Sequence, residues 1–226
     1  MYYIEKNINK LNTIGETFFL DPKELREISY KLKKNDYNIY YPYKDSEKVI
    51  LYKKKIPEVL LYEIKSKISL RHQDILGTIF SLGISNELFG DILIIDNHYY
   101  IYILPIARNY FESNLVTIKN SHIELTQLDI DTLSNYEREY DKLELIVSSN
   151  RIDTVISNLC NTSRSNIEDK IKKKEILLNN DLLKSNSYKL KDNDTFSIKK
   201  IGKFKFNRVI KETKGNHIIV EVLKYK

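Results

Sequence analysis

The side chains of this chain that could do chemistry are mainly cations, and they are unevenly distributed. Residues 145–226 carry 18 Lys and Arg against 9 Asp and Glu, residues 72–144 carry 4 against 12, and residues 1–71 carry 15 against 10. The formal net charge of +6 therefore combines an acidic centre of −8 with flanking blocks of +5 and +9. The last block is suited to binding a polyanion, and the acidic centre to contacting something else. Local drift in a lysine-rich chain is the alternative interpretation.

Motifs for covalent or metal-assisted catalysis are absent from the sequence. It has no glycine-rich phosphate loop, no H-E-x-x-H helix and no G-x-S-x-G turn. His72 and Asp74 could be imagined as an acid–base pair, but side chains two positions apart on a helix diverge. The single Cys160 fits a reducing compartment and can form neither an internal disulfide nor a Cys-based zinc site. We therefore expect no catalytic residues, no metal and no cofactor.

Length and composition predict ordered, globular domains. The 226 residues are 42% hydrophobic and 30% charged, with only 6 Gly and 4 Pro, and they can bury one large core or two to three small ones. The apolar runs fall far short of the roughly 20 residues that a membrane span needs, and the first residues do not resemble a secretory signal. We expect a cytoplasmic protein that does not enter membranes.

Periodicity and turn residues predict an α+β fold in the first 142 residues. Asp21 and Pro22 are typical of a helix start, Gly83 of a helix end, and Gly90-Asp91 of a break in the chain. Asp96-Asn97 predicts a tight hairpin turn. We expect helices at 22–32, 72–82 and 105–115, strands at 37–41, 49–52, 59–64, 92–95 and 99–104, and a solvated connector at 129–142.

The remaining residues predict two helices followed by a mostly antiparallel sheet. Apolar residues at helical spacing from Ile152 to Leu159 mark the first helix. Ser165 and Glu168 fit a capping box at the start of the second helix. We expect strands at 143–147, 176–179, 195–198, 203–206 and 218–223, with a turn at Lys214-Gly215-Asn216.

Several aromatic and basic groups allow two interpretations. Lys53-Lys54-Lys55 beside a tyrosine cluster could neutralise and stack on RNA, or could form the solvated edge of a half-buried sheet. The rings of Tyr99, Tyr100 and Tyr102 fit either a stacking platform or a core. Each alternative stays open at the level of the sequence.

Four short motifs near the C-terminus resemble, in order and spacing, the S4 RNA-binding domain. They are Arg151-Ile152-Asp153, Ser163-Arg164-Ser165, Ile176 to Asn179 and Asp192-Asn193-Asp194. Four upstream motifs are similar to YlmH-type proteins of low-GC bacteria: Phe19-Leu20-Asp21-Pro22, His72 to Gly77, Leu82-Gly83-Ile84 and Phe89 to Leu93. The resemblance covers about residues 17–226. Lys174 and Asn193 depart from it, because they stand where S4 domains usually have Gly.

The resemblance implies an N-terminal α+β region with an RRM-like subdomain and a C-terminal S4 (αL-type) domain. The expected boundaries are 1–66 for the N-terminal α+β subdomain, 67–142 for the RRM-like subdomain and 143–226 for the S4 domain. It also implies RNA-binding residues, namely Arg151, Ser163, Arg164, Ser165, Lys172, Lys173, Lys174 and Asn179. Lys174 could equally complement the dipole of a helix end. Lys199, Lys200, Lys203 and Lys205 could widen the RNA-binding footprint, and Lys203 and Lys205 could equally be solvated without contacting RNA.

The function that this resemblance implies is non-enzymatic. We expect a monomeric factor that binds structured ribosomal RNA on the large ribosomal subunit, in quality control of stalled subunits that carry peptidyl-tRNA. Direct contact with peptidyl-tRNA, and with ribosomal proteins through the acidic block, would extend the set of partners. The alternatives are an S4-linked RNA-modifying enzyme and a protein-interaction adaptor linked to cell division.

Overall fold

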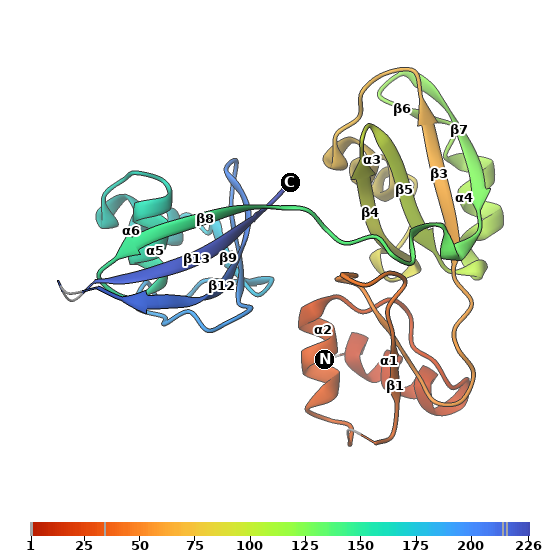
Figure 1. The fold of residues 1–226 in the computed structure, drawn as a ribbon. Coiled ribbons are helices and arrows are strands. Elements are labelled where there is room, and N and C mark those ends of the chain that lie inside the picture. Colours follow the sequence, from red (N-terminus) through yellow and green to blue (C-terminus); the bar gives the residue numbers. More distant parts are fainter. Residues whose placement is uncertain (1, 34, 214, 216) are drawn as a thin grey trace. The chain divides into compact units, whose positions relative to one another are not determined.

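The computed structural model describes residues 2–33, 35–213, 215 and 217–226, and it divides into two compact units between Glu137 and Arg138 (Figure 1). The expected start of the last domain, residue 143, lies a few residues too late. The strand β8 begins at Tyr140 and takes up the end of the expected connector. None of the described helices is long and apolar enough to cross a membrane.

The first unit begins with two helices and a small hairpin. The helices are α1 (Tyr2–Thr13) and α2 (Pro22–Ser29), and the hairpin pairs β1 (Asn38–Tyr40) with β2 (Ile50–Tyr52). The helix start expected at Asp21 forms, and it takes the form of a capping box: the Asp21 carboxylate accepts from the amides of Lys23 and Glu24, while Glu24 accepts from the Asp21 amide. The helix start and the hairpin are therefore confirmed.

A five-stranded antiparallel sheet follows, in the order β4-β5-β3-β7-β6 (Figure 1). Its elements are β3 (Leu60–Ser66), α3 (His72–Ser81), η1 (Asn86–Leu88), β4 (Phe89–Ile95), β5 (His98–Ile103), η2 (Pro105–Ala107), α4 (Arg108–Asn114), β6 (Thr117–Ile118), β7 (Ser121–Leu128) and η3 (Ile130–Leu133). Because β3 lies between β5 and β7, it belongs to this sheet and not to the preceding hairpin. The expected boundary between residues 66 and 67 therefore cuts at the end of the sheet's central strand.

Both faces of this sheet are covered, at least in part. The side chains of Tyr62, Ile101 and Ile103 pack with α3 and α4 in one core cluster. The alternate side chains of Leu61 and Tyr102 pack with the N-terminal region in another. Tyr99 and Tyr102 are 3% and 0% exposed, which settles these two rings as core residues.

Gly90 and Asp91 lie inside β4, so the expected chain break at these two residues is wrong. A Cβ atom at Gly90 would stand 3.0 Å from the ring of Phe19 and 3.0 Å from the Cβ of Tyr102. The glycine is needed because the N-terminal segment approaches the strand closely, not because the chain turns. Asp91 then accepts hydrogen bonds from the Tyr43 hydroxyl at 2.7 Å and the Glu47 amide at 2.7 Å, which tie this segment to the sheet.

The carboxyl group of Glu24 makes the first unit sensitive to pH. Burial raises the pKa of Glu24 to about 7 from 4.5; the charges of Asp21 and Glu87 act in the same direction, and Lys48 opposes them. The folded state thus binds more protons than the unfolded chain between about pH 4.5 and 7, so the free energy of unfolding falls as the pH rises through this window.

Glu24→Gln should therefore raise the free energy of unfolding at pH 8 by on the order of 1 kcal/mol, since the group is half-buried, and should raise the thermal midpoint accordingly. At pH 5 the gain should be much smaller. The amide oxygen of Gln can still accept from the Asp21 amide, so the capping box survives. Calorimetry at the two pH values measures the effect. An equal gain at both would show that the charge of Glu24 is not the cause.

The second unit is a six-stranded antiparallel sheet with two helices packed into its core. The strand order is β10-β9-β11-β12-β13-β8. Its elements are β8 (Tyr140–Val147), α5 (Ile152–Leu159), α6 (Arg164–Lys172), β9 (Ile176–Leu178), β10 (Asp181–Leu182), β11 (Thr195–Ile198), β12 (Gly202–Glu212) and β13 (Ile218–Tyr225). The two helices and the antiparallel sheet are as predicted. Of the expected turn at 214–216, Lys214 and Asn216 lie outside the described residues.

Candidate nucleic-acid interface

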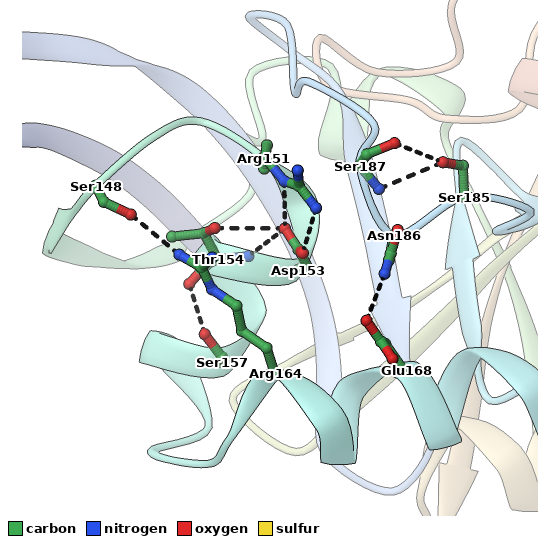
Figure 2. Close-up of polar contacts among 10 residues, drawn as sticks. All are labelled: Ser148, Arg151, Asp153, Thr154, Ser157, Arg164, Glu168, Ser185, Asn186 and Ser187. Atoms are coloured by element: carbon green, nitrogen blue, oxygen red, sulfur yellow. Dashed lines mark hydrogen bonds and ion pairs between the residues drawn. The ribbon is translucent and has the colours of Figure 1, made fainter.

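One loop of the second unit holds the start of α5 and the middle of α6; Figure 2 shows its contact with α6, between Asn186 and Glu168. The amide of Ile152 donates to the carbonyl of Tyr188 at 2.8 Å, and the side-chain amide of Asn186 donates to Glu168 at 2.7 Å. One segment thus holds the first turn of α5 and the middle of α6. The two helices are presented as a fixed pair.

Arg151 lies at the N-cap of α5 but is engaged within the protein. Its Nε and Nη2 atoms donate to the two carboxylate oxygens of Asp153 at 3.1 and 2.7 Å (Figure 2). Burial alone would raise the pKa of Asp153, but the hydrogen bonds and charge of Arg151 outweigh it and lower that pKa. Because this bidentate pair occupies one side of the guanidinium, Arg151 acts first as a structural partner, and its expected role as a free phosphate ligand is weakened.

Arg164 and Ser163 stand at the start of α6. The cap is Ser163, whose hydroxyl accepts from the Asn166 amide at 3.3 Å, so the expected cap at Ser165 is wrong. Ser165 instead shares a 2.8 Å hydrogen bond with the Ser163 hydroxyl. The Arg164 side chain reaches across to the Ser148 hydroxyl at 3.0 Å and leaves its other donors available (Figure 2).

A polar hollow of about 490 Å³ surrounds this arginine. It is bounded by the end of β8, one side of α5, the α5–α6 loop and the start of β13. The lining residues are Ile146, Val147, Ser148, Thr154, Ser157, Asn158, Asn161, Thr162, Ser163, Arg164 and His217. None of them is acidic. Such a lining is suited to an anion with polar substituents.

A cluster of lysines lies at the other end of α6. The run Lys172-Lys173-Lys174 is exposed there, and so are Lys199 and Lys200 in the β11–β12 turn. The register pairs Ile198 with Ile176, and the Lys199 amide donates to the Glu175 carbonyl at 2.9 Å, so the two groups converge. We call these five residues the lysine cluster. Since α6 rises about 1.5 Å per residue, the lysine cluster and Arg164 are roughly 12 Å apart along the helix.

Lys174 adopts the left-handed backbone that S4 domains usually give to Gly, with a φ of 57°. Its amide donates to the carbonyl of Ile171 at 2.9 Å, and that of Glu175 donates to Lys170 at 2.9 Å. This is a Schellman motif, in which Gly is the favoured residue at the position of Lys174. The chain therefore keeps a cation where the backbone favours Gly.

Asn179 is occupied inside the protein. Its side chain donates to Asp194 at 2.7 Å and accepts from the Thr195 amide at 2.8 Å, which joins two turns. Asn193 is left-handed as well, with a φ of 70°, which suits Asn. Asn179 thus serves the fold of the sheet, and the expectation that it faces RNA does not fit its hydrogen bonds.

Lys203 and Lys205 lie on the face of β12 opposite the buried Phe204 and Phe206, as predicted. The Lys203 ammonium stands 4.9 Å from the ring centroid of Tyr225. A cation placed over a ring in this way is partly satisfied within the protein. Both lysines lie apart from α6, on the outer face of the sheet, so they do not join the lysine cluster.

Comparisons with known proteins agree with the resemblance seen in the sequence. Residues 57–132 match the family model of the putative RNA-binding domain in YlmH. The ribosome-associated protein quality control protein P2 of Bacillus subtilis (strain 168) is 22% identical over 211 residues, covering 88% of this chain and 82% of that protein. The chain is similar to YlmH-type proteins. A solved structure, the cell division protein ylmH from Streptococcus pneumoniae, is 20% identical, covers 56% of this chain and 87% of its own, and has a TM-score of 0.46.

The segment that matches the family model begins at residue 57, before β3, and so includes the whole five-stranded sheet up to η3. It holds a second hollow, of about 390 Å³, beside Tyr62, Arg108 and Glu112. Burial and the neighbouring Glu112 raise the pKa of Tyr62 to about 12, while its hydrogen bond lowers the pKa of Glu112. Neither group is poised to exchange a proton near neutral pH.

Asp74, which could have formed an acid–base pair with His72, is engaged by two cations. It pairs with Arg71 and Lys119, at 2.9 Å each. Among residues 2–33, 35–213, 215 and 217–226, no group of three or more His, Cys, Asp or Glu side chains could hold a metal ion.

Sequence reasoning missed most of the hollow around Arg164. Much of its polar lining comes from small hydrogen-bonding residues, Ser148 and the run Asn161-Thr162-Ser163, that look like parts of ordinary loops. A possible signal was that both flank the apolar stripe of α5. His217 could not be found this way, because the pairing of β13 with β8 brings it in from far along the chain.

Lys174→Gly should separate the two interpretations of Lys174. Gly relieves the left-handed backbone and should stabilise the second unit by about 1 kcal/mol. If Lys174 contacts phosphate, the same change should weaken RNA binding severalfold despite the gain in stability. Thermal unfolding and RNA titration measure the two effects. Unchanged affinity would mean that the charge only complements the end of α6.

Proposed function

We propose that this protein is a non-enzymatic, cytoplasmic RNA-binding factor that binds structured ribosomal RNA on the large ribosomal subunit through its second unit. The observation that carries the proposal is the pair of cationic sites at the two ends of α6, namely Arg164 with its hollow and the lysine cluster. Lysine and arginine side chains on a fixed scaffold bind phosphates and position a protein on folded RNA.

The setting of this proposal comes from the relatives. The Bacillus subtilis relative is named a ribosome-associated quality control protein, and the family model over residues 57–132 is named for RNA binding. We propose that this chain acts on stalled large subunits that carry peptidyl-tRNA, as a monomer. Peptidyl-tRNA and ribosomal proteins are further candidate partners, the latter through the acidic block at 72–144.

Binding of the full chain to purified large-subunit ribosomal RNA tests the proposal. With several phosphate contacts, the logarithm of the affinity should fall with the logarithm of the salt concentration by roughly 0.7 to 0.9 per contact. Fluorescence anisotropy over a KCl series gives this slope. A slope near zero would count against phosphate recognition. Association with subunits that survives nuclease treatment would favour a protein-interaction adaptor instead.

A further inference from the structure

The hollow around Arg164 is an open depression that is lined mainly by polar side chains. Its volume of about 490 Å³ lies in the range of small-molecule sites, roughly 300 to 1,000 Å³. A surface that only follows an RNA backbone needs exposed cations, whereas this one also supplies side-chain amides and an exposed aliphatic side chain. The lysine cluster has no comparable depression among the described pockets.

One side of the hollow is suited to a phosphate. The Nη2 atom of Arg164 is positioned by Ser148, and its other donors make no hydrogen bond to a described residue. The Arg164 and Ser165 amides at the start of α6 have no partner among the described hydrogen bonds, so they can also donate to an anion there. The Nδ1 atom of His217 lies 2.7 Å from the Gly215 carbonyl, which can only accept, so Nδ1 is the donor and Nε2 is an acceptor, suited to a ribose hydroxyl.

The other side of the hollow is suited to a nucleobase. Ile146 is 60% exposed and offers an apolar surface. The side chain of Asn158 donates to the Ile146 carbonyl at 3.1 Å, which leaves its oxygen available as an acceptor. Asn161 is exposed, and its side-chain amide makes no hydrogen bond to any other described residue. Two amide side chains above an aliphatic surface can pair with the polar edge of a base that lies on that surface.

We infer that the hollow takes a single unpaired nucleotide extruded from the bound RNA, with its phosphate against Arg164, its ribose hydroxyl against His217 and its base between Ile146 and the two asparagines. This inference rests on the proposed function and names the feature of the RNA, an unpaired nucleotide, that the second unit recognises. A base-paired nucleotide cannot enter, because its base is held in the stack and its edge is occupied by its partner. The second unit therefore selects helices interrupted by a bulge over continuous ones.

Three RNA hairpins of one sequence test this inference with the full chain. The first is fully paired, the second carries one bulged uridine, and the third carries an abasic bulge. We expect the bulged hairpin to bind about tenfold more tightly than the paired one, equivalent to about 1.4 kcal/mol, and the abasic bulge to lose most of this advantage. Equal affinity for the paired and bulged hairpins would overturn the inference.

Asn161→Gly is the matching variant. Asn161 has a φ of 47°, a conformation that Gly adopts without strain, so the substitution removes only the side chain. The variant should lose the preference for the bulge while binding the paired hairpin normally. Asn97→Gly, at a φ of 63° in the β4–β5 turn of the first unit, is the control and should change nothing.

A preference for the bulge that persists in Asn161→Gly and also in Asn158→Ala would overturn the assigned site. The thermal midpoint of each variant shows that it is folded. If the proposed function itself were wrong, the result would differ from a mere loss of bulge preference. In that case neither the three hairpins nor ribosomal RNA would bind in a salt-dependent way.

Discussion

Replacing Lys172, Lys173 and Lys174 by Gln should lower the affinity for large-subunit RNA by about 10- to 100-fold near physiological salt, and should lower the salt slope by about 2 to 3. These lysines are exposed at the end of α6, and the Lys199 backbone brings two more cations beside them. With each lysine charge removed, fewer counterions should be released when the RNA binds. Anisotropy titrations over a KCl series measure both quantities.

The chain contains its own control for this experiment. Lys53-Lys54-Lys55 is a second run of three exposed lysines, and it lies in the first unit. Replacing these three by Gln changes the net charge by the same amount. We expect this variant to bind RNA almost as well as the unaltered protein. An equal loss in both variants would mean that net charge, not the site on α6, governs binding, and a loss only at 53–55 would move the interface to the first unit.

Asp91→Ala should destabilise the first unit by about 3 to 5 kcal/mol. Its carboxylate accepts from the Tyr43 hydroxyl, the Glu47 amide and, at 3.3 Å, the Lys48 amide. Removing it leaves these three donors without this acceptor, which costs more than the net value of the bonds themselves. Urea unfolding followed by tyrosine fluorescence measures the loss.

The effect of Asp91→Ala should be confined to one unit. Residues 43–48 would separate from β4, whereas the sheet of the second unit should keep its stability and its RNA affinity. Asp91→Asn retains an acceptor and should cost less. A loss below about 1 kcal/mol for the alanine variant would show that water replaces the carboxylate and that the N-terminal segment is held mainly by its apolar contacts.

Local patterns predicted most of the elements. Asp96 and Asn97 both have positive φ, as a two-residue hairpin turn requires, and Gly83 ends α3 with a φ of 76°. The prediction of a chain break at Gly90 was wrong because a glycine in a turn and a glycine that another segment approaches closely look alike in a sequence. Only the position of Phe19, far along the chain, distinguishes them.

The candidate site was predicted in its residue types but only partly in its geometry. Ser163 and Ser165 can each act as the N-cap of α6. Which of them does so depends on where the α5–α6 loop ends, and the sequence does not specify this. Arg151 and Asn179 had the right chemistry for RNA, but their partners, Asp153 and Asp194, use that chemistry inside the fold. Lys199 and Lys200 join the lysine cluster through the strand register, which no local pattern specifies.

Sedimentation of the tagged full chain with ribosomal subunits tests the central claim most directly. At low salt, we expect the protein in the large-subunit fractions, a marked loss of the variant with Gln at 172–174, and retention of the variant with Gln at 53–55. Absence of the unaltered protein from large-subunit fractions at low salt would contradict the account, and so would equal retention of both variants.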